Sequence, residues 1–424
     1  MEYKEKNLGS YKLHMIKTNR FKTIRVKVFF NAPIEKDEIT IRNFLSTTLA
    51  TTNHKYKTKR EFAIKKEELY AASIGSGTTR FGNYSNLSFG LNTLLDKYTE
   101  KGNFEKCLEF FSDSIYKPNI ENSKFDQEYF DVAREKTATH LHSIKEDTSY
   151  YSTIRLLEEI DSNSPLSYRA CGYLEDLENI TTSNLVSYYN KLLDSDIMDI
   201  FVIGDINFDE VEELIRKYFP IKVFKKIEKE ARIDEIKTTK VKTVVEKNDS
   251  NQSKLVMGFM LNNLEKYERN YPLTLYSIIL GGGTNSKLFR NVREKNSLCY
   301  YIHSTINKLD NLLMVRAGIS KNNFDEVVKL VKKEVSELKK GNISLEELEN
   351  AKKMYVSSID ELEESQDDII DSYYMMDLIG IDDIETRKKK MMEVTLEDVM
   401  GVAKKVHLNT VYLLEGDKDE ENWA

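Results

Sequence analysis

The stretch LGGGTNSKLFRNVREKNSLCY, residues 280–300, is the most informative segment of this sequence. Its three consecutive glycines invite comparison with phosphate-binding loops. Neither G-x-G-x-x-G nor G-x-x-x-x-G-K-[ST] is present, and a phosphate cradle needs those spacings to aim backbone N–H groups at the anion. A nucleotide-binding function is therefore not indicated, and the glycines need another explanation.

Around this stretch the chain repeats itself. Three landmarks occur in the same order in each half, and their spacing agrees: Asn103 to Thr181 is 78 residues, and Asn323 to Thr395 is 72. Each threonine is placed to cap a helix, because its hydroxyl can accept an orphan N–H of the first turn. The landmarks are a helix start (103–106 and 323–326), a long charged helix (125–145 and 344–364), and a Thr-capped helix followed by an apolar strand ending in Gly-Asp (180–205 and 394–417).

The order of strands and helices predicts the fold class. Residues 25–30 and 254–260 read as strands that precede the long helices of their halves. Strands grouped apart from helices indicate an α+β fold, with an antiparallel sheet packed against helices in each of two homologous domains. We expect an N-terminal domain over residues 1–225 and a C-terminal domain over 226–424. The Lys- and Glu-rich stretch 222–247 would connect them and carry a strand or two.

Composition narrows the function classes. Lys and Arg number 63 against 70 Asp and Glu, so the net charge of −7 gives no general reason to bind nucleic acid. The three cysteines are widely spaced and form no C-x-x-C pair, which favours a reducing compartment. The polar N-terminus lacks the apolar core of a signal peptide, and no stretch approaches 18 apolar residues. We expect a soluble cytoplasmic protein that binds neither nucleic acid nor membrane.

The stretch 280–300 resembles the LGGG-x-x-S-x-L-F…R-E-x(5)-Y pattern in the C-terminal domain of M16 (insulinase-like, pitrilysin-type) metallopeptidases. The resemblance implies two domains of the LuxS/MPP-like metallohydrolase fold. It also implies that Arg293 and Tyr300 grip the substrate near the scissile bond. A guanidinium and a phenol can both donate to a carbonyl oxygen as it becomes an oxyanion. The alternative is an arginine that packs a helix end and a tyrosine half-buried in a strand.

The catalytic half of the family pattern is missing. The family carries His-x-x-Glu-His on a helix of the N-terminal domain, where two His bind zinc and the Glu is the general base. The resemblance places this helix at residues 41–49, where Asn43, Ser46 and Thr47 replace the first His, the Glu and the second His. The third ligand, a Glu in the family, falls near His140. These residues cannot make a normal zinc site, so we expect no catalytic residue and no metal in this chain.

By this resemblance the chain is the non-metal subunit of a heterodimer. Its partner would be an M16 homologue with an intact His-x-x-Glu-His, and zinc is expected in that partner. The substrate would be a peptide or unfolded segment that adds a strand to an exposed sheet edge. The isolated chain could form a homodimer. The resemblance extends to a bacterial branch of M16-like proteins associated with elongation factor P modification.

Two other functions stay open. The chain could be a pseudoenzyme scaffold or peptide-binding module, in which Arg293 and Tyr300 are vestigial. It could also be an independent enzyme with a metal held by His140 and His142, although a spacing of two residues on a helix points side chains about 200° apart.

Overall fold

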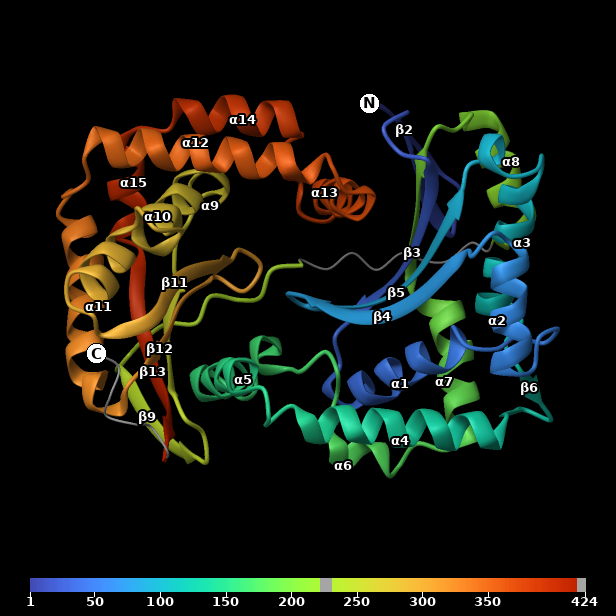
Figure 1. The fold of residues 1–424 in the computed structure, drawn as a ribbon, viewed down its shortest axis with the longest axis horizontal. Helices are drawn as coiled ribbons and strands as arrows, with labels where there is room; N and C mark the ends of the chain where they lie inside the picture. Colours follow the sequence, from blue (N-terminus) through green and yellow to red (C-terminus); the bar gives the residue numbers. More distant parts are fainter. Residues whose placement is uncertain (222–230, 418–424) are drawn as a thin grey trace. The chain divides into compact units, whose positions relative to one another are not determined.

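The computed structural model describes residues 1–221 and 231–417, and the chain divides into two compact units (Figure 1). The first, termed the N-unit, comprises Met1–His142, Arg169–Glu230 and Ser365–Ser372; the second, termed the C-unit, comprises Ser143–Tyr168, Ala231–Glu364 and Tyr373–Ala424. The expected boundary between residues 225 and 226 lies outside the described residues. The division into domains 1–225 and 226–424 therefore stays a prediction.

A six-stranded sheet forms the centre of the N-unit, in the order β1-β2-β8-β3-β5-β4. β2 and β8 are parallel, and the other neighbouring pairs are antiparallel. The predicted strand at residues 25–30 lies within β3. The strands are β1 (Glu2–Asn7), β2 (Tyr11–Lys17), β3 (Thr23–Pro33), β4 (Ser73–Phe81), β5 (Tyr84–Leu94) and β8 (Ile197–Gly204), with a separate short hairpin of β6 (Ile120–Glu121) and β7 (Lys124–Phe125).

The C-unit contains a five-stranded sheet in the order β11-β12-β10-β13-β9. Here β13 and β9 are the parallel pair, and the remaining pairs are antiparallel. The predicted strand at residues 254–260 lies within β10. The strands are β9 (Lys242–Asn248), β10 (Ser253–Leu261), β11 (Cys299–Asn307), β12 (Leu312–Ile319) and β13 (Val406–Gly416).

The two sheets repeat one topology, because β2-β8-β3-β5-β4 has the same order as β9-β13-β10-β12-β11. This agreement confirms the internal repeat. The expected antiparallel sheets are observed with one modification, a parallel pair in each. The last strand of each sheet follows a helical connection and lies beside an early strand, β8 beside β2 and β13 beside β9, and a crossover of this kind gives a parallel pair.

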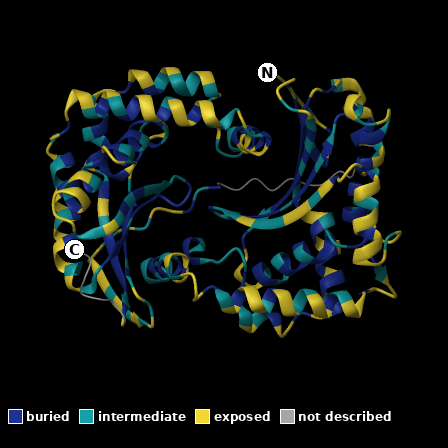
Figure 2. Cartoon of the chain, in the orientation of Figure 1, coloured by how far each residue is buried: buried dark blue, intermediate teal, exposed yellow. Residues whose placement is uncertain are grey.

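Helices pack against each sheet, and buried residues gather between the two layers while exposed ones lie on the outer helix faces (Figure 2). On β10, Leu255, Met257 and Phe259 alternate into the core of the C-unit, as the period of two along a strand requires. The N-unit helices are α1 (Ile39–Leu49), α2 (Lys59–Glu68), α3 (Asn103–Tyr116), α4 (Gln127–Ser143), α6 (Leu174–Leu177), α7 (Thr182–Ser195) and α8 (Phe208–Tyr218). The C-unit has α5 (Thr148–Ile160), α9 (Lys266–Asn270), α10 (Pro272–Gly281), α11 (Phe324–Lys339), α12 (Leu345–Leu362), the second half of α13 (Gln366–Ile379), α14 (Ile384–Glu393) and α15 (Leu396–Ala403).

The predicted threonine caps are both confirmed. Thr181 Oγ1 accepts the backbone N–H of Asn184, and Thr395 Oγ1 accepts that of Asp398, each at 3.2 Å. The side chains of Asn184 and Asp398 accept the capping residues' own N–H groups, which completes a capping box at α7 and at α15. The same local chemistry therefore starts the last helix of both repeats.

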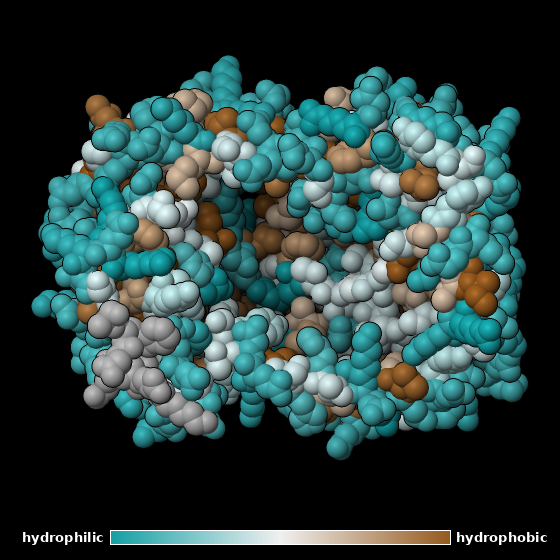
Figure 3. Space-filling view, in the orientation of Figure 1, coloured by the Kyte–Doolittle hydropathy of each residue, from teal (hydrophilic) through white to brown (hydrophobic). Residues whose placement is uncertain are grey.

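The outer surface is mainly hydrophilic in the face shown by the space-filling view (Figure 3), as expected for a chain with 31% charged residues. Among the described residues, no helix combines the length and apolar character needed to cross a membrane.

Two segments, 143–168 and 365–372, belong to a different unit from the residues that precede them in the chain. Helix α5 follows the N-unit helix α4 but packs on β10 and β13 of the C-unit. Gly258 of β10 makes this approach possible, because a Cβ there would lie 2.9 Å from Ile160 Cδ1. Conversely, the first turns of α13 belong to the N-unit, where Gln366 Nε2 donates to Thr23 O and Ile203 O at 3.0 and 3.2 Å.

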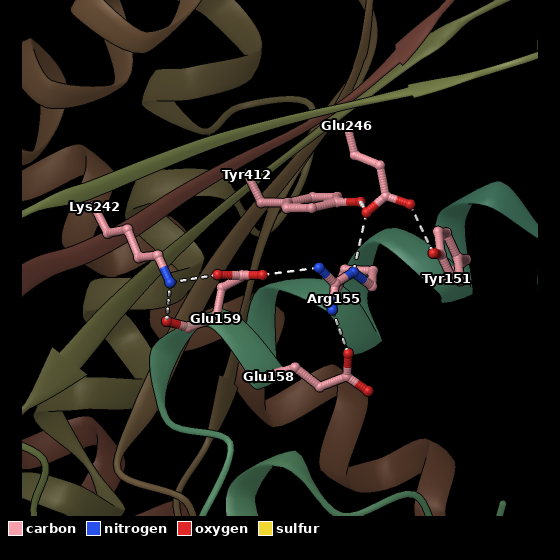
Figure 4. Close-up of polar contacts among 7 residues, drawn as sticks. All are labelled: Tyr151, Arg155, Glu158, Glu159, Lys242, Glu246 and Tyr412. Carbon is pink, nitrogen blue, oxygen red and sulfur yellow. Dashed lines mark hydrogen bonds and ion pairs between the residues drawn. The ribbon is translucent and has the colours of Figure 1, made fainter. Parts of the chain in front are cut away.

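A polar network holds α5 on its sheet (Figure 4). Arg155 donates to three carboxylates, at 3.0 Å to Glu246 of β9 and at 2.5 and 2.8 Å to Glu158 and Glu159 of its own helix. Glu246 also accepts hydrogen bonds from the phenols of Tyr151, at 2.7 Å, and of Tyr412 on β13, at 2.9 Å. Residues of α5, β9 and β13 thus converge on one carboxylate.

Candidate functional site

The glycine-rich stretch ends α10 and packs its backbone directly against β11. A Cβ at Gly281 would lie 2.6 Å from the backbone nitrogen of Ser304, so only glycine fits this position without movement. Ser286 then closes the turn, since its hydroxyl donates to Gly283 O at 2.6 Å. Leu288 and Val292 are fully buried and anchor a π-helical turn, η4 (Phe289–Glu294). This anchoring leaves Arg293 exposed on the turn's outer side.

Tyr300 reaches Arg293 because the chain reverses between them. Ser297, in the left-handed region with φ of 52°, donates its N–H to Arg293 O at 2.9 Å, and Leu298 donates to Val292 O at 3.1 Å. Tyr300 follows in β11, where the register shifts between Cys299 and Tyr301, and its side chain is 68% exposed. The Arg293 guanidinium carbon lies 5.8 Å from the centroid of the Tyr300 ring.

Arg293 and Tyr300 line one pocket of the C-unit, with a volume of about 510 Å³. The volume lies within the range of small-ligand and peptide pockets. Burial raises the pKa of the Cys299 thiol to about 11 although the Arg293 charge acts to lower it, so this cysteine is protonated at neutral pH and is no nucleophile. The remaining lining comes from the same segment and from two others: Ser297 and Leu298, then Gln252, and then Gly318, Ile319, Ser320, Asn322 and Asn323.

The pocket residues outside the family pattern were not predicted from the sequence. Gln252 precedes β10, and Ser320 and Asn322 follow β12; both strands lead to the end of the sheet where β11 begins. The pairing of Ser253 with Ile319, and of Cys299 with the same Ile319, brings these three strand ends together. No local pattern marks these residues, because strand register alone assembles them.

In the N-unit, the residues expected from the sequence to replace zinc ligands form ordinary contacts of a helix with its surroundings. Asn43 donates to Cys171 O and accepts from Thr78 Oγ1, both at 2.9 Å. The hydroxyls of Ser46 and Thr47 donate to backbone carbonyls of α1, at 2.7 and 2.8 Å. Zinc requires His nitrogen, Cys sulfur or carboxylate oxygen, and an amide with two hydroxyls committed in this way does not fit the ion.

The rest of each unit also offers no cluster of metal-ligating side chains, as far as the structure describes it. Within either unit, the described residues hold no group of three His, Cys, Asp or Glu side chains with ligand atoms all within 4.8 Å of one another.

His140 lies on the exposed side of α4. The ring contact between α4 and α1 is made instead by Phe130 and Phe44, with centroids 5.0 Å apart. Ten residues of α-helix separate Phe130 from His140, which corresponds to roughly 15 Å along the axis. His140 and His142 occupy one helix, not a strand, so the chelating arrangement considered from the sequence is not formed.

Within the described residues, β4 is one edge strand of the N-unit sheet and β11 is one edge strand of the C-unit sheet; each pairs with a neighbour on one side only. On β4, Gly75 and Gly77 have open space where a Cβ would stand. Ser76 of the same strand donates to Ser46 O of α1 at 2.6 Å. The edge strand β4 therefore runs beside helix α1, and the edge strand β11 begins at Cys299, next to Tyr300.

Comparisons with known proteins agree with this architecture. Residues 179–355 match a family model described as peptidase M16 inactive domain. The chain is 28% identical over 423 residues to a protein of Bacillus subtilis (strain 168) named probable inactive metalloprotease YmfF, covering 98% of each. It is 22% identical to zinc protease PqqE of Helicobacter pylori (strain ATCC 700392 / 26695), covering 81% of this chain and 78% of that protein.

Two solved structures have a similar fold. A conserved protein from Enterococcus faecalis V583 superposes with a TM-score of 0.91 at 27% identity, covering 99% of this chain and all of that one. A structure described as a peptidase M16 inactive domain, from Pseudomonas fluorescens, superposes with a TM-score of 0.81 at 17% identity and covers the whole of both chains.

Proposed function

Since this chain is a relative of the M16 peptidases, we propose that it is a catalytically incomplete subunit that supplies a substrate-binding Arg293–Tyr300 pair to a zinc-bearing homologue. The observation that carries the proposal is the placement of the two side chains. They are exposed, adjacent and share one pocket at the start of a free sheet edge. Zinc belongs to the partner in this proposal, since the residues of α1 do not fit it.

The chemistry of the pair suits a peptide carbonyl. The guanidinium stays charged at every relevant pH and the phenol donates one hydrogen bond, so together they can hold an oxygen that gains negative charge. The edge strands β4 and β11 offer unpaired backbone groups that an extended peptide can pair with. A peptide or unfolded segment, recognised mainly by its backbone, is the substrate that both features support.

The other functional proposal is a scaffold or peptide-binding module without a role in hydrolysis. The names of the relatives support an inactive chain and leave the partner open. A link to elongation factor P modification and a cytoplasmic location stay predictions of the sequence resemblance. The scaffold and subunit proposals differ in one respect: only the second requires Arg293 and Tyr300 for cleavage.

The test compares this chain alone with the chain mixed with its zinc-motif homologue from the same source. A quenched-peptide library reports cleavage, and metal content is measured for both samples. We expect the lone chain to be silent and zinc-free, and the mixture to cleave. Arg293→Ala should lower kcat/KM of the mixture by about 10²–10³-fold, as loss of an oxyanion donor does.

Matched controls lie beside both residues. Arg290→Ala removes a guanidinium from the same π-helical turn, where it pairs with Glu347 outside the pocket. Tyr301→Phe removes the neighbouring phenol for comparison with Tyr300→Phe. Controls within about twofold of the parent, with the two pocket variants impaired, support the subunit proposal. A cleaving pair that is indifferent to both pocket variants makes the chain a scaffold, and cleavage by the lone chain with bound metal refutes both.

A further inference from the structure

The pocket beside Arg293 has an unbalanced charge. Arg293 forms no ion pair with any residue that the structure describes, and its guanidinium lies instead over the rings of Phe289 and Tyr300 at 4.9 and 5.8 Å. No Asp or Glu lines the pocket within the described chain. The side chains that do line it are amides, hydroxyls and apolar groups. The Arg293 guanidinium therefore lines a pocket in which no described residue carries a negative charge.

Gln252 adds a second donor whose orientation is fixed by a neighbour. Lys254 Nζ donates to Gln252 Oε1 at 2.6 Å. An ammonium has no acceptor, so its partner must be the amide oxygen, and the two N–H bonds of Gln252 remain available to a ligand. The Lys254 ammonium also adds a positive charge behind the amide.

The loop after β12 completes the wall. Asn323 Nδ2 donates to Leu298 O at 3.2 Å and holds this loop against the start of β11. Asn322 and Ser320 line the pocket from the same loop. Asn322 is exposed, so its amide can turn toward a ligand.

We propose that this pocket is a subsite for a carboxylate of the bound peptide, either an Asp or Glu side chain or the chain terminus, held by Arg293, Gln252 and Asn322. The inference deepens the proposed function and rests on it, because the pocket is the one that the substrate-binding pair lines. The five N–H donors of a guanidinium allow Arg293 to hold this carboxylate and still donate to a peptide carbonyl. The carboxylate accepts from the amide N–H groups as well, whereas a lysine side chain would be repelled.

Binding to the isolated chain tests the subsite without any partner. Four fluorescein-labelled extended peptides share one Gly/Ser-rich sequence. The first carries one central Glu and the second Gln in its place; the third and fourth are their C-terminally amidated forms. We expect a peptide with the recognised carboxylate to bind about tenfold more tightly than its neutral counterpart, which corresponds to one charge-assisted contact. Tighter binding of the Glu peptide than of the Gln peptide in both C-terminal forms assigns the subsite to the side chain. Tighter binding of both free-acid peptides than of their amidated forms assigns it to the chain terminus.

Two single substitutions each offset the positive charge of the pocket while leaving Arg293 and Tyr300 in place. Gln252→Glu and Asn322→Asp each add a carboxylate to the wall, and each should abolish the acid preference. Asn285→Asp makes the same change at an exposed position of the C-unit outside this pocket and should keep the preference. Equal affinity for all four peptides, or no binding up to about 1 mM, overturns the subsite.

The outcome is independent of the hydrolysis assay. If the isolated chain selects carboxylates but the mixture with the homologue never cleaves, the subsite stands and the subunit proposal fails. If the mixture cleaves Glu and Gln peptides equally and Gln252→Glu and Asn322→Asp change nothing, the subunit proposal stands and the subsite fails.

Discussion

Replacing Arg155 by alanine should loosen α5 from the C-unit. The guanidinium holds three carboxylates at once, and one of them, Glu246, ties the helix to strand β9 (Figure 4). Without it, Glu158 and Glu159 on the helix each lose one ion pair while staying mostly shielded from solvent, although Glu159 keeps its contact with Lys242. The apolar contacts of α5 with β10 remain in the variant, so the effect isolates the polar network.

The structure sets the size of the effect. The side chain of Arg155 is 25% exposed, and those of Glu158, Glu159 and Glu246 are 19%, 18% and 34% exposed. Ion pairs at such partly solvated sites are screened, so each contributes about 0.5–1 kcal/mol and not the larger value of a buried pair. Three contacts give about 2 kcal/mol. If α5 opens locally, its amide hydrogens should exchange about thirtyfold faster.

Hydrogen–deuterium exchange of the α5 amides, with urea unfolding alongside, measures both quantities. Lys242→Ala is the control, since Lys242 contacts Glu159 from a side chain that is 52% exposed and should contribute less than about 0.5 kcal/mol. Equal effects of Arg155→Ala and Lys242→Ala on α5 amide exchange and on the free energy of unfolding would contradict this role of Arg155. It is also refuted if exchange in α5 is unchanged while the rest of the unit is destabilised.

Three further effects follow from single contacts. Arg42→Met should destabilise the N-unit by about 3–5 kcal/mol in urea unfolding, because it leaves Asp196, with a side chain only 3% exposed, as an unpaired buried charge; adding Asp196→Leu should recover most of the loss. Burial acts to raise the pKa of Glu246, but hydrogen bonds from two tyrosines and an arginine outweigh it, and the pKa lies below the ordinary value of 4.5. The stability from this lowered pKa is therefore present above pH 4.5 and lost as the pH falls through the folded-state pKa, and Glu246→Gln should flatten that part of the urea-midpoint profile. Gly281→Ala should cost about 1–3 kcal/mol in thermal unfolding, because its Cβ would meet the backbone of Ser304, and an unchanged Tm would contradict the close approach.

Some features of the fold could be predicted because they depend on neighbouring residues. The threonine caps of α7 and α15 follow from a hydroxyl and the next turn of backbone. The strands β3 and β10 follow from side-chain composition, and the repeat follows from the order of such elements. The run at 280–300 could be related to a known pattern because its glycines, Ser286 and buried leucines all act within one stretch of chain.

Other features could not be predicted because they depend on which strands and helices meet. The correspondence of His140 with the third ligand position stays a prediction, since it depends on how α4 packs on α1, where Phe130 contacts Phe44. The parallel pairs β2/β8 and β9/β13 join strands far apart in sequence. Nothing local to these segments specifies their partners.

The sequence alone was enough for the fold class and the twofold repeat, and its resemblance to a known pattern singled out Arg293 and Tyr300 as the proposed substrate-binding pair. These predictions depend on residue identities and on spacings between residues that are close in the sequence. Only the tertiary structure decided that α5 belongs to the C-unit, that Arg155 and Glu246 meet, and that Gln252 shares a pocket with Arg293. Those arrangements arise from long-range contacts, whose free energy depends on the path of the whole chain and leaves no periodicity in any one segment.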